Sequence, residues 1–185
     1  TMVDDFQLKK ISNSFMGKAL YGKSVIPLDA YVLNKNSKDR TIFLNIVNIL
    51  GVDVLVGVDN LSFFNIPYLK TELNNIVKIL EIYEKLGLPQ IILGDFNNDY
   101  EKYEFKILTN YGLKLISSTK KTAFNQDPSG ATIDQIYASE KLLKIFSVKK
   151  TDVVQSIESD HYPIFVDLEL KKSKKSTVPA PAPLP

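Results

Sequence analysis

The sequence predicts one mixed α/β domain followed by a short basic and proline-rich tail. Short segments rich in Val, Ile and aromatic residues recur between turn residues, which is typical of strands. One longer segment, residues 67–86, has apolar residues at spacings of three and four, which is typical of an amphipathic helix. The composition, with 44% hydrophobic and 24% charged residues, is that of a globular protein.

The individual elements follow from these patterns. We expect strands over residues 17–21, 25–33, 40–49, 52–58, 90–95, 113–117, 131–138, 146–153 and 162–170. Pro67 suits the first turn of the long helix and Gly87 its end, and residues 100–110 predict a second, shorter helix. The order strand, helix, strand over residues 52–95 favours a right-handed βαβ unit in a mixed sheet.

Composition changes abruptly after residue 170. We therefore expect the domain to span residues 1–170, with residues 1–16 left without a firm assignment. Residues 171–185 combine lysines with alternating prolines, which predicts a disordered tail or linker of polyproline II character. A docking segment for a proline-reading domain is the alternative.

Several classes of chemistry are excluded by composition. The chain has no cysteine, so it has neither disulfides nor thiol catalysis, and His161 is its only histidine. No apolar run approaches the roughly 18 residues of a membrane span, and the first ten residues do not resemble a signal peptide. We expect a soluble protein with no membrane span, in a compartment that the sequence leaves open.

Charge gives no argument for a nucleic-acid partner. The net charge is +2, and four lysines in residues 171–185 supply +4, so the rest of the chain carries −2. A slightly acidic domain has no electrostatic preference for DNA or RNA.

The most informative segment is residues 90–97. Three apolar residues lead into Gly94, Asp95, Phe96 and Asn97, which predicts a buried strand with polar residues at its carboxyl end. Because side chains alternate along a strand, Asp95 and Asn97 face one ligand while Phe96 faces the core. The alternative is a strand followed by a simple Asx turn.

Two further polar clusters follow, Thr132-Ile133-Asp134 and Ser159-Asp160-His161-Tyr162-Pro163. In this order, and with Gly94 to Asn97, they resemble the endonuclease/exonuclease/phosphatase superfamily over about residues 17–170. The resemblance implies a four-layer α/β/β/α sandwich of the DNase I-like type, shortened at its N-terminus. It also implies a Mg²⁺-dependent phosphoesterase or nuclease.

The resemblance assigns roles in the hydrolysis of a phosphate ester. Negative charge develops on the non-bridging oxygens while a water attacks in line. Asp95 would orient or deprotonate this water, and Asn97 would bind the phosphoryl oxygen or the nucleophile. His161 would donate to the phosphoryl oxygen, and Asp134 would fix the histidine's tautomer.

A divalent cation belongs to the same implied mechanism. Mg²⁺ or Mn²⁺ fits oxygen ligands in a chain without cysteine, and Asp160 would be its ligand. Ser159 and Asn60 would lie on the substrate side, with Ser159 bracing the loop. Many members have a histidine where this chain has Asn60, and an asparagine cannot carry charge or a proton.

The chain lacks two residues that the resemblance requires. Active members carry an Asn strand and a Glu upstream of the segment that resembles residues 17–24, and residues 1–16 contain no Glu. We therefore expect weak metal binding by this chain alone, and a fragment or incomplete site that a second chain or segment completes. The alternative is a catalytically degenerate homologue that acts as a binding or scaffold protein. An unrelated α/β binding protein with coincidental motifs is a third interpretation.

The substrate stays open beyond a phosphate-containing molecule, with nucleic acid among the candidates. Loops over residues 59–66, 98–103 and 118–130 would select it. Tyr100, Tyr103 and Phe124 in these loops suit either base stacking or the anchoring of the loops.

Overall fold

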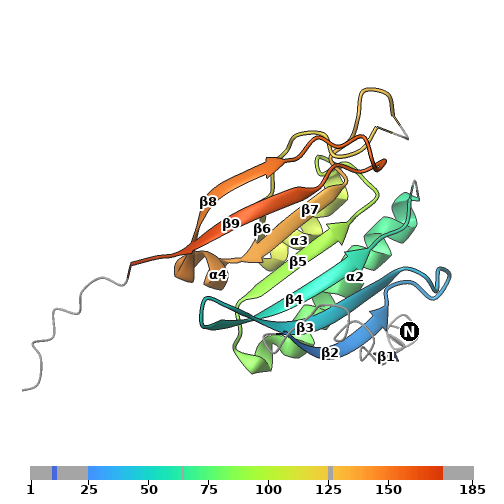
Figure 1. Cartoon of the computed structure of the whole chain (residues 1–185). Helices are drawn as coiled ribbons and strands as arrows, with labels where there is room; N and C mark the ends of the chain where they lie inside the picture. Colours follow the sequence, from blue (N-terminus) through green and yellow to red (C-terminus); the bar gives the residue numbers. More distant parts are fainter. Residues whose placement is uncertain (1–9, 12–24, 64, 125–126, 173–185) are drawn as a thin grey trace, which may run out of the picture.

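The computed structural model describes residues 10–11, 25–63, 65–124 and 127–172, in which a seven-stranded mixed sheet is the central element (Figure 1). Its strand order is β1-β2-β3-β4-β5-β7-β6, and β8 and β9 form a separate two-stranded sheet. The strands are β1 (Lys10–Ile11), β2 (Val25–Val32), β3 (Thr41–Ile49), β4 (Val52–Asn60), β5 (Gln90–Asp95), β6 (Leu113–Leu115), β7 (Asp134–Ser139), β8 (Phe146–Val153) and β9 (Ile164–Leu170). The helices are α2 (Ile66–Tyr83), α3 (Lys106–Tyr111) and α4 (Glu140–Ile145), with 3-10 turns η2 (Glu84–Leu86) and η3 (Tyr103–Phe105).

The middle of the large sheet contains its one parallel pair among the described strands. Strands β4 and β5 run parallel and are joined by α2, as the strand, helix, strand pattern predicts. Strand β7 then pairs antiparallel with β5. In these registers Asp95 lies opposite Asn60 on one side and opposite Asp134 on the other, so polar residues of three strands meet at one edge.

Helix α2 covers one face of the sheet. Its sequence has an N-terminal cap, a stripe of apolar residues along one side, and a glycine at its end. The Asn65 side chain accepts a hydrogen bond from the Tyr68 N–H at 3.1 Å, which caps the first turn. Gly87, at φ +66°, ends the helical segment after η2. The buried stripe packs on the sheet and consists of Leu69, Leu73, Ile76, Ile79 and Leu80.

Strands β8 and β9 cover the opposite face. Their residues Phe146, Val166 and Leu168 pack in one cluster with Val54 and Ile91 of the large sheet. The described residues thus form three layers, with α2 and α3 on one side and the two-stranded sheet on the other (Figure 1). The mixed α/β class is confirmed, whereas the second helical layer of a four-layer sandwich is not formed by the described residues.

Some predicted boundaries were wrong, for local reasons. Residues 100–102 are a turn rather than helix, because the Asp99 carboxylate accepts the Glu101 N–H at 3.1 Å. Helix α4 was not predicted; its start is capped by Ser139, which accepts the Leu142 N–H at 3.3 Å. The strand expected over residues 17–21 and the tail from residue 173 lie outside the described residues. Among the described helices, none is long and apolar enough to cross a membrane.

Candidate functional site

The end of β5 is held rigidly from both sides. Gly94 has φ +151°, and a Cβ atom there would lie 2.0 Å from the Asp59 carbonyl oxygen, so only glycine fits between β4 and β5. Beyond the strand, the Phe96 N–H donates to the Ile133 carbonyl at 2.8 Å. The Phe96 ring is fully buried, as predicted. Because alternate residues face opposite sides, this burial turns the Asp95 carboxylate to the face covered by β8 and β9.

Asp95, Asp134 and His161 come together on that face. His161 Nδ1 lies 2.8 Å from Asp134 Oδ2, and His161 Nε2 lies 3.8 Å from Asp95 Oδ2. The side chains are 29% exposed for His161 and Asp95 and 18% for Asp134, so they are sheltered but reachable by solvent. The sequence predicts all three, and the β5–β7 register together with the turn before β9 brings them together.

The two acidic partners govern the protonation of His161. Burial alone lowers the pKa of the imidazole, but the hydrogen bond and charge of Asp134, with the charges of Asp95 and Asp160, outweigh it and raise the pKa. Burial raises the pKa of Asp95, an effect that the Asn97 N–H partly offsets and the Asp134 charge reinforces. The two carboxylates therefore stabilise a proton or another positive charge at His161.

Asn97 lies beside Asp95 in a left-handed turn with φ +50°. Its N–H donates to Asp95 Oδ1 at 2.8 Å, so the segment forms an Asx turn as well as a strand end. The Asn97 side-chain NH₂ donates to the Leu61 carbonyl at 2.7 Å and to Asn60 Oδ1 at 3.1 Å. These bonds position the Asn97 carboxamide and leave its oxygen as the group that can accept a further hydrogen bond.

Arg40 was missed by the motif analysis. It directly precedes β3, and its Nη1 donates to Asn60 Oδ1 at 3.1 Å. It lies within the segment that resembles the family's middle strands but was given no role there; the available signal was that Arg40 is the only arginine of the chain.

The loop before β9 carries His161, Ser159 and Asp160. The Ser159 hydroxyl accepts the His161 N–H at 3.2 Å, which shapes the turn. Tyr162 donates its N–H to the Thr122 carbonyl at 2.7 Å and so fastens this loop to a neighbouring one. Ser159 and Asp160 are exposed.

Asp95, Asp134 and His161 also form a candidate metal group. One ligand atom from each lies within 4.8 Å of the others. Two carboxylates and an imidazole suit a divalent cation such as Mg²⁺ or Mn²⁺. Asp160, the predicted metal ligand, is not part of this group.

The aromatic residues of the nearby loops differ in their environment. The Tyr100 hydroxyl donates to Glu101 at 3.0 Å. The Tyr103 ring is 74% exposed, with Lys106 Nζ 4.6 Å from its centroid. Phe124 is 42% exposed and lies 5.5 Å from the Tyr162 ring.

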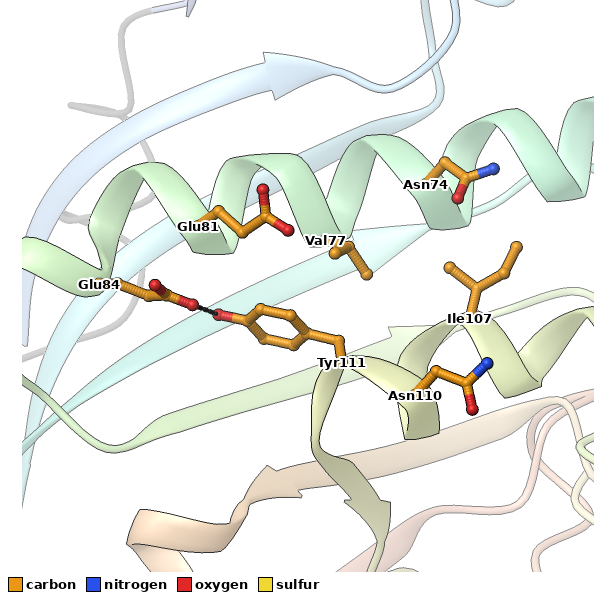
Figure 2. Close-up of a pocket in the computed structure, with 7 residues that line it drawn as sticks. All are labelled: Asn74, Val77, Glu81, Glu84, Ile107, Asn110 and Tyr111. Atoms are coloured by element: carbon orange, nitrogen blue, oxygen red, sulfur yellow. Dashed lines mark hydrogen bonds between the residues drawn. The ribbon is translucent and has the colours of Figure 1, made fainter.

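A separate hollow of about 630 Å³ lies between α2 and α3 on the helical side of the molecule (Figure 2). Glu84 accepts a hydrogen bond from the Tyr111 hydroxyl at 2.8 Å on one of its walls. None of the predicted site residues lines it.

Comparison with known proteins identifies the fold. No protein-family model matches the sequence, and no curated protein matches it significantly. Solved structures do. The endonuclease/exonuclease/phosphatase from Bacteroides vulgatus has a TM-score of 0.61 and 19% identity, over 82% of this chain and 69% of that chain. The catalytic domain of human Nocturnin has a TM-score of 0.60 and 15% identity, over 80% and 60% of the respective chains.

A third similar structure is the mannosyl-6-phosphatase of Bacteroides thetaiotaomicron, with a TM-score of 0.51 and 21% identity over 78% of this chain and 59% of that chain. The chain thus matches about 60 to 70% of the length of these neighbours. Identities this low establish the fold alone. The resemblance predicted from the motifs is confirmed at that level: the chain has the fold of the endonuclease/exonuclease/phosphatase proteins.

Proposed function

We propose that this chain is a phosphoesterase domain that hydrolyses a phosphate ester by metal-assisted attack of water. The main support is the trio of Asp95, Asp134 and His161. It lies at the edge of the large sheet where β4 and β5 end and β7 begins. The fold of the compared structures supports the proposal, and one of them is named as a mannosyl-6-phosphatase.

In this proposal each protein group has a defined task. The Asp95 carboxylate accepts a proton from the attacking water and orients it for in-line attack, with the Asn97 side-chain oxygen as a second acceptor. His161 donates from Nε2 to a non-bridging phosphoryl oxygen. Asp134 accepts from Nδ1 at 2.8 Å and stabilises the protonated imidazolium, in which Nε2 also carries a hydrogen to donate.

The proposed cofactor is Mg²⁺ or Mn²⁺, whose donor chemistry fits the carboxylate oxygens of this site. Asp160 is the ligand that the resemblance implies, whereas Asp95 belongs to the group whose ligand atoms lie within 4.8 Å of one another. A cation held there would neutralise charge on the phosphoryl oxygens. We expect weak binding, because Asp160 is exposed and residues 1–16 contain no glutamate. Isothermal titration with Mg²⁺ and Mn²⁺ measures this; tight binding by this chain would contradict the expectation.

We further propose residues 1–170 as the domain and residues 171–185 as a tail. The domain would be one part of a four-layer sandwich, whose second sheet and second helical layer another segment or chain completes. The two-stranded β8–β9 sheet supports this, because the matching neighbours are longer. The competing proposal is a binding protein without turnover; it is favoured by the Asn97 and Asn60 amides being bonded to each other.

Hydrolysis of bis-p-nitrophenyl phosphate and relaxation of plasmid DNA, each with Mg²⁺ or Mn²⁺, test the enzymatic proposal. We expect Asp95→Asn and His161→Gln each to reduce the rate by about 100-fold or more. Asp167→Asn, an exposed acid of β9, serves as the control and should retain the wild-type rate. A wild-type rate that equals those of the two site variants would favour the binding protein instead.

A further inference from the structure

Arg40 differs from the other basic residues of the chain, which are all lysines. The sequence has 23 lysines and arginines, and Arg40 is its only arginine. Arginine forms planar, two-pronged hydrogen bonds with phosphate, whereas lysine acts as a point charge. The one residue with this geometry lies at the candidate site, hydrogen-bonded to Asn60 at 3.1 Å.

Hydrogen bonds connect Arg40 to the hydrolytic residues through one atom. Asn60 Oδ1 accepts both from Arg40 Nη1 and from the Asn97 NH₂, each at 3.1 Å. Asn60 lies opposite Asp95 in the β4–β5 register. The positive charge of Arg40 also lies close enough to lower the pKa of Asp95, against the larger effect of burial. Hydrogen bonds through Asn60 therefore link the guanidinium to Asn97, and strand pairing places Asn60 opposite Asp95, the carboxylate proposed to activate water.

A cationic side chain at the site would offset the charge of its carboxylates. Asp95, Asp134 and Asp160 repel a phosphate, and Asn60 cannot carry a charge. Two lysines of the loop over residues 118–130 are engaged in ion pairs: Lys120 pairs with Asp152 at 2.8 Å, and Lys121 with Asp99 at 3.9 Å. A guanidinium has five N–H donors, and Asn60 receives one of them.

We propose that Arg40 is a phosphate-binding residue of this site, with Asn60 holding its guanidinium toward the non-bridging oxygens of the substrate. This inference rests on the proposed function and makes it more specific. The ligand chemistry is a phosphate group whose charge Arg40 neutralises. Asn60 then acts by positioning the arginine rather than by charge.

A purely structural role for Arg40 gives different expectations. Its other contact is with Asp39, 3.8 Å from Arg40 Nε, and the Asp39 side chain is 74% exposed. Ion pairs this exposed contribute little to stability. A structural arginine would therefore affect folding slightly and phosphate binding not at all.

The test exploits the single arginine, whose Nε–H group gives one unambiguous nitrogen-15 NMR signal. Inorganic phosphate is titrated into the wild-type chain while that signal is followed. We expect a saturable shift of the Arg40 signal. A second titration compares phosphate affinity in Arg40→Met, Arg40→Lys and Lys38→Met, the last removing an exposed charge two residues away. Arg40→Met should bind about 10-fold or more weakly, Arg40→Lys should be intermediate and Lys38→Met unchanged.

An Arg40 signal that stays still at saturating phosphate overturns the inference, as does equal affinity in Arg40→Met and Lys38→Met. A wild-type chain that binds no phosphate overturns it too. Hydrolysis of bis-p-nitrophenyl phosphate, measured in parallel, decides the proposed function separately. If the wild-type chain turns over substrate and Arg40→Met leaves its KM unchanged, the proposed role of Arg40 is rejected and the phosphoesterase function is retained. If phosphate binding depends on Arg40 but no turnover is observed, the role of Arg40 in binding is retained and the phosphoesterase function is rejected.

Discussion

Replacing Gly94 by alanine should separate β4 from β5 at the point where the site is built. The new Cβ would lie 2.0 Å from the Asp59 carbonyl oxygen and 2.9 Å from the Asp59 carbonyl carbon. Both atoms belong to the backbone of the neighbouring strand, so no side-chain rotation relieves the contact. Real Cβ atoms stay beyond 3.0 Å, and the strands would have to move apart by about 1 Å.

The expected loss of stability has two contributions. The backbone at Gly94, φ +151°, is disfavoured for any other residue and costs about 1–3 kcal/mol. Crowding of a packed site costs about 1–3 kcal/mol more. Gly94→Ala should therefore lower the free energy of unfolding by about 2–6 kcal/mol, measured by urea denaturation. Displacement of Asp95 from His161 should also weaken any phosphoesterase activity.

Gly112→Ala is the matched control. Gly112 also has a positive φ, +115°, but nothing lies within 4 Å of its added Cβ. This variant should show only the backbone cost, about 1–3 kcal/mol. Equal destabilisation by the two alanines would refute the argument that close approach of β4 and β5 requires Gly94.

Three other predictions concern the core and its edge. Asp59 is buried with no partner for its carboxylate oxygens, and burial raises its pKa well above the usual range. The free energy of unfolding should therefore fall above about pH 4, by up to about 1.4 kcal/mol per pH unit, until the pKa of Asp59 in the folded state is reached. Urea denaturation at several pH values measures this slope, and Asp59→Asn should flatten it. Phe96→Ala, which removes a fully buried ring, should cost about 3–5 kcal/mol by the same assay. Asn65→Ala, which removes the cap of α2, should cost about 0.5–2 kcal/mol and lower the thermal unfolding midpoint.

Sequence patterns predicted the elements in which the pattern of apolar residues is long and unbroken. Helix α2 has a complete buried stripe with a proline and a glycine at its ends, and β5 is a continuous apolar run. Helix α4 has only six residues, too few for the helical period to show, and the Ser139 cap before it resembles the end of β7. The extra turn at residues 100–102 follows from one Asp99 carboxylate, which competes with helix formation.

The candidate site was predictable to the extent that its residues occur in motifs. Asp95, Asp134 and His161 follow from short segments next to strands, and strand pairing brings them together. No sequence pattern indicated a role for Arg40 or Asp59. Their importance comes from register: Asn60, which Arg40 contacts, pairs with Asp95, and Asp59 pairs with Gly94. Such pairings are set by tertiary contacts, which the local sequence does not specify.

The same register places the proposed phosphate-binding and metal-binding residues on different parts of the fold. In the proposed function, the large sheet supplies the Asp95 carboxylate and the Arg40 guanidinium held by Asn60, and the His161 imidazole reaches Asp95 from the loop before β9. Asp160, the proposed metal anchor, is exposed on the loop before β9, in the smaller sheet. A chain built in this way should bind phosphate better than it binds Mg²⁺. Completing the smaller sheet should therefore raise metal affinity more than phosphate affinity, because the proposed phosphate-binding Arg40 is already held by Asn60 at the edge of the seven-stranded sheet.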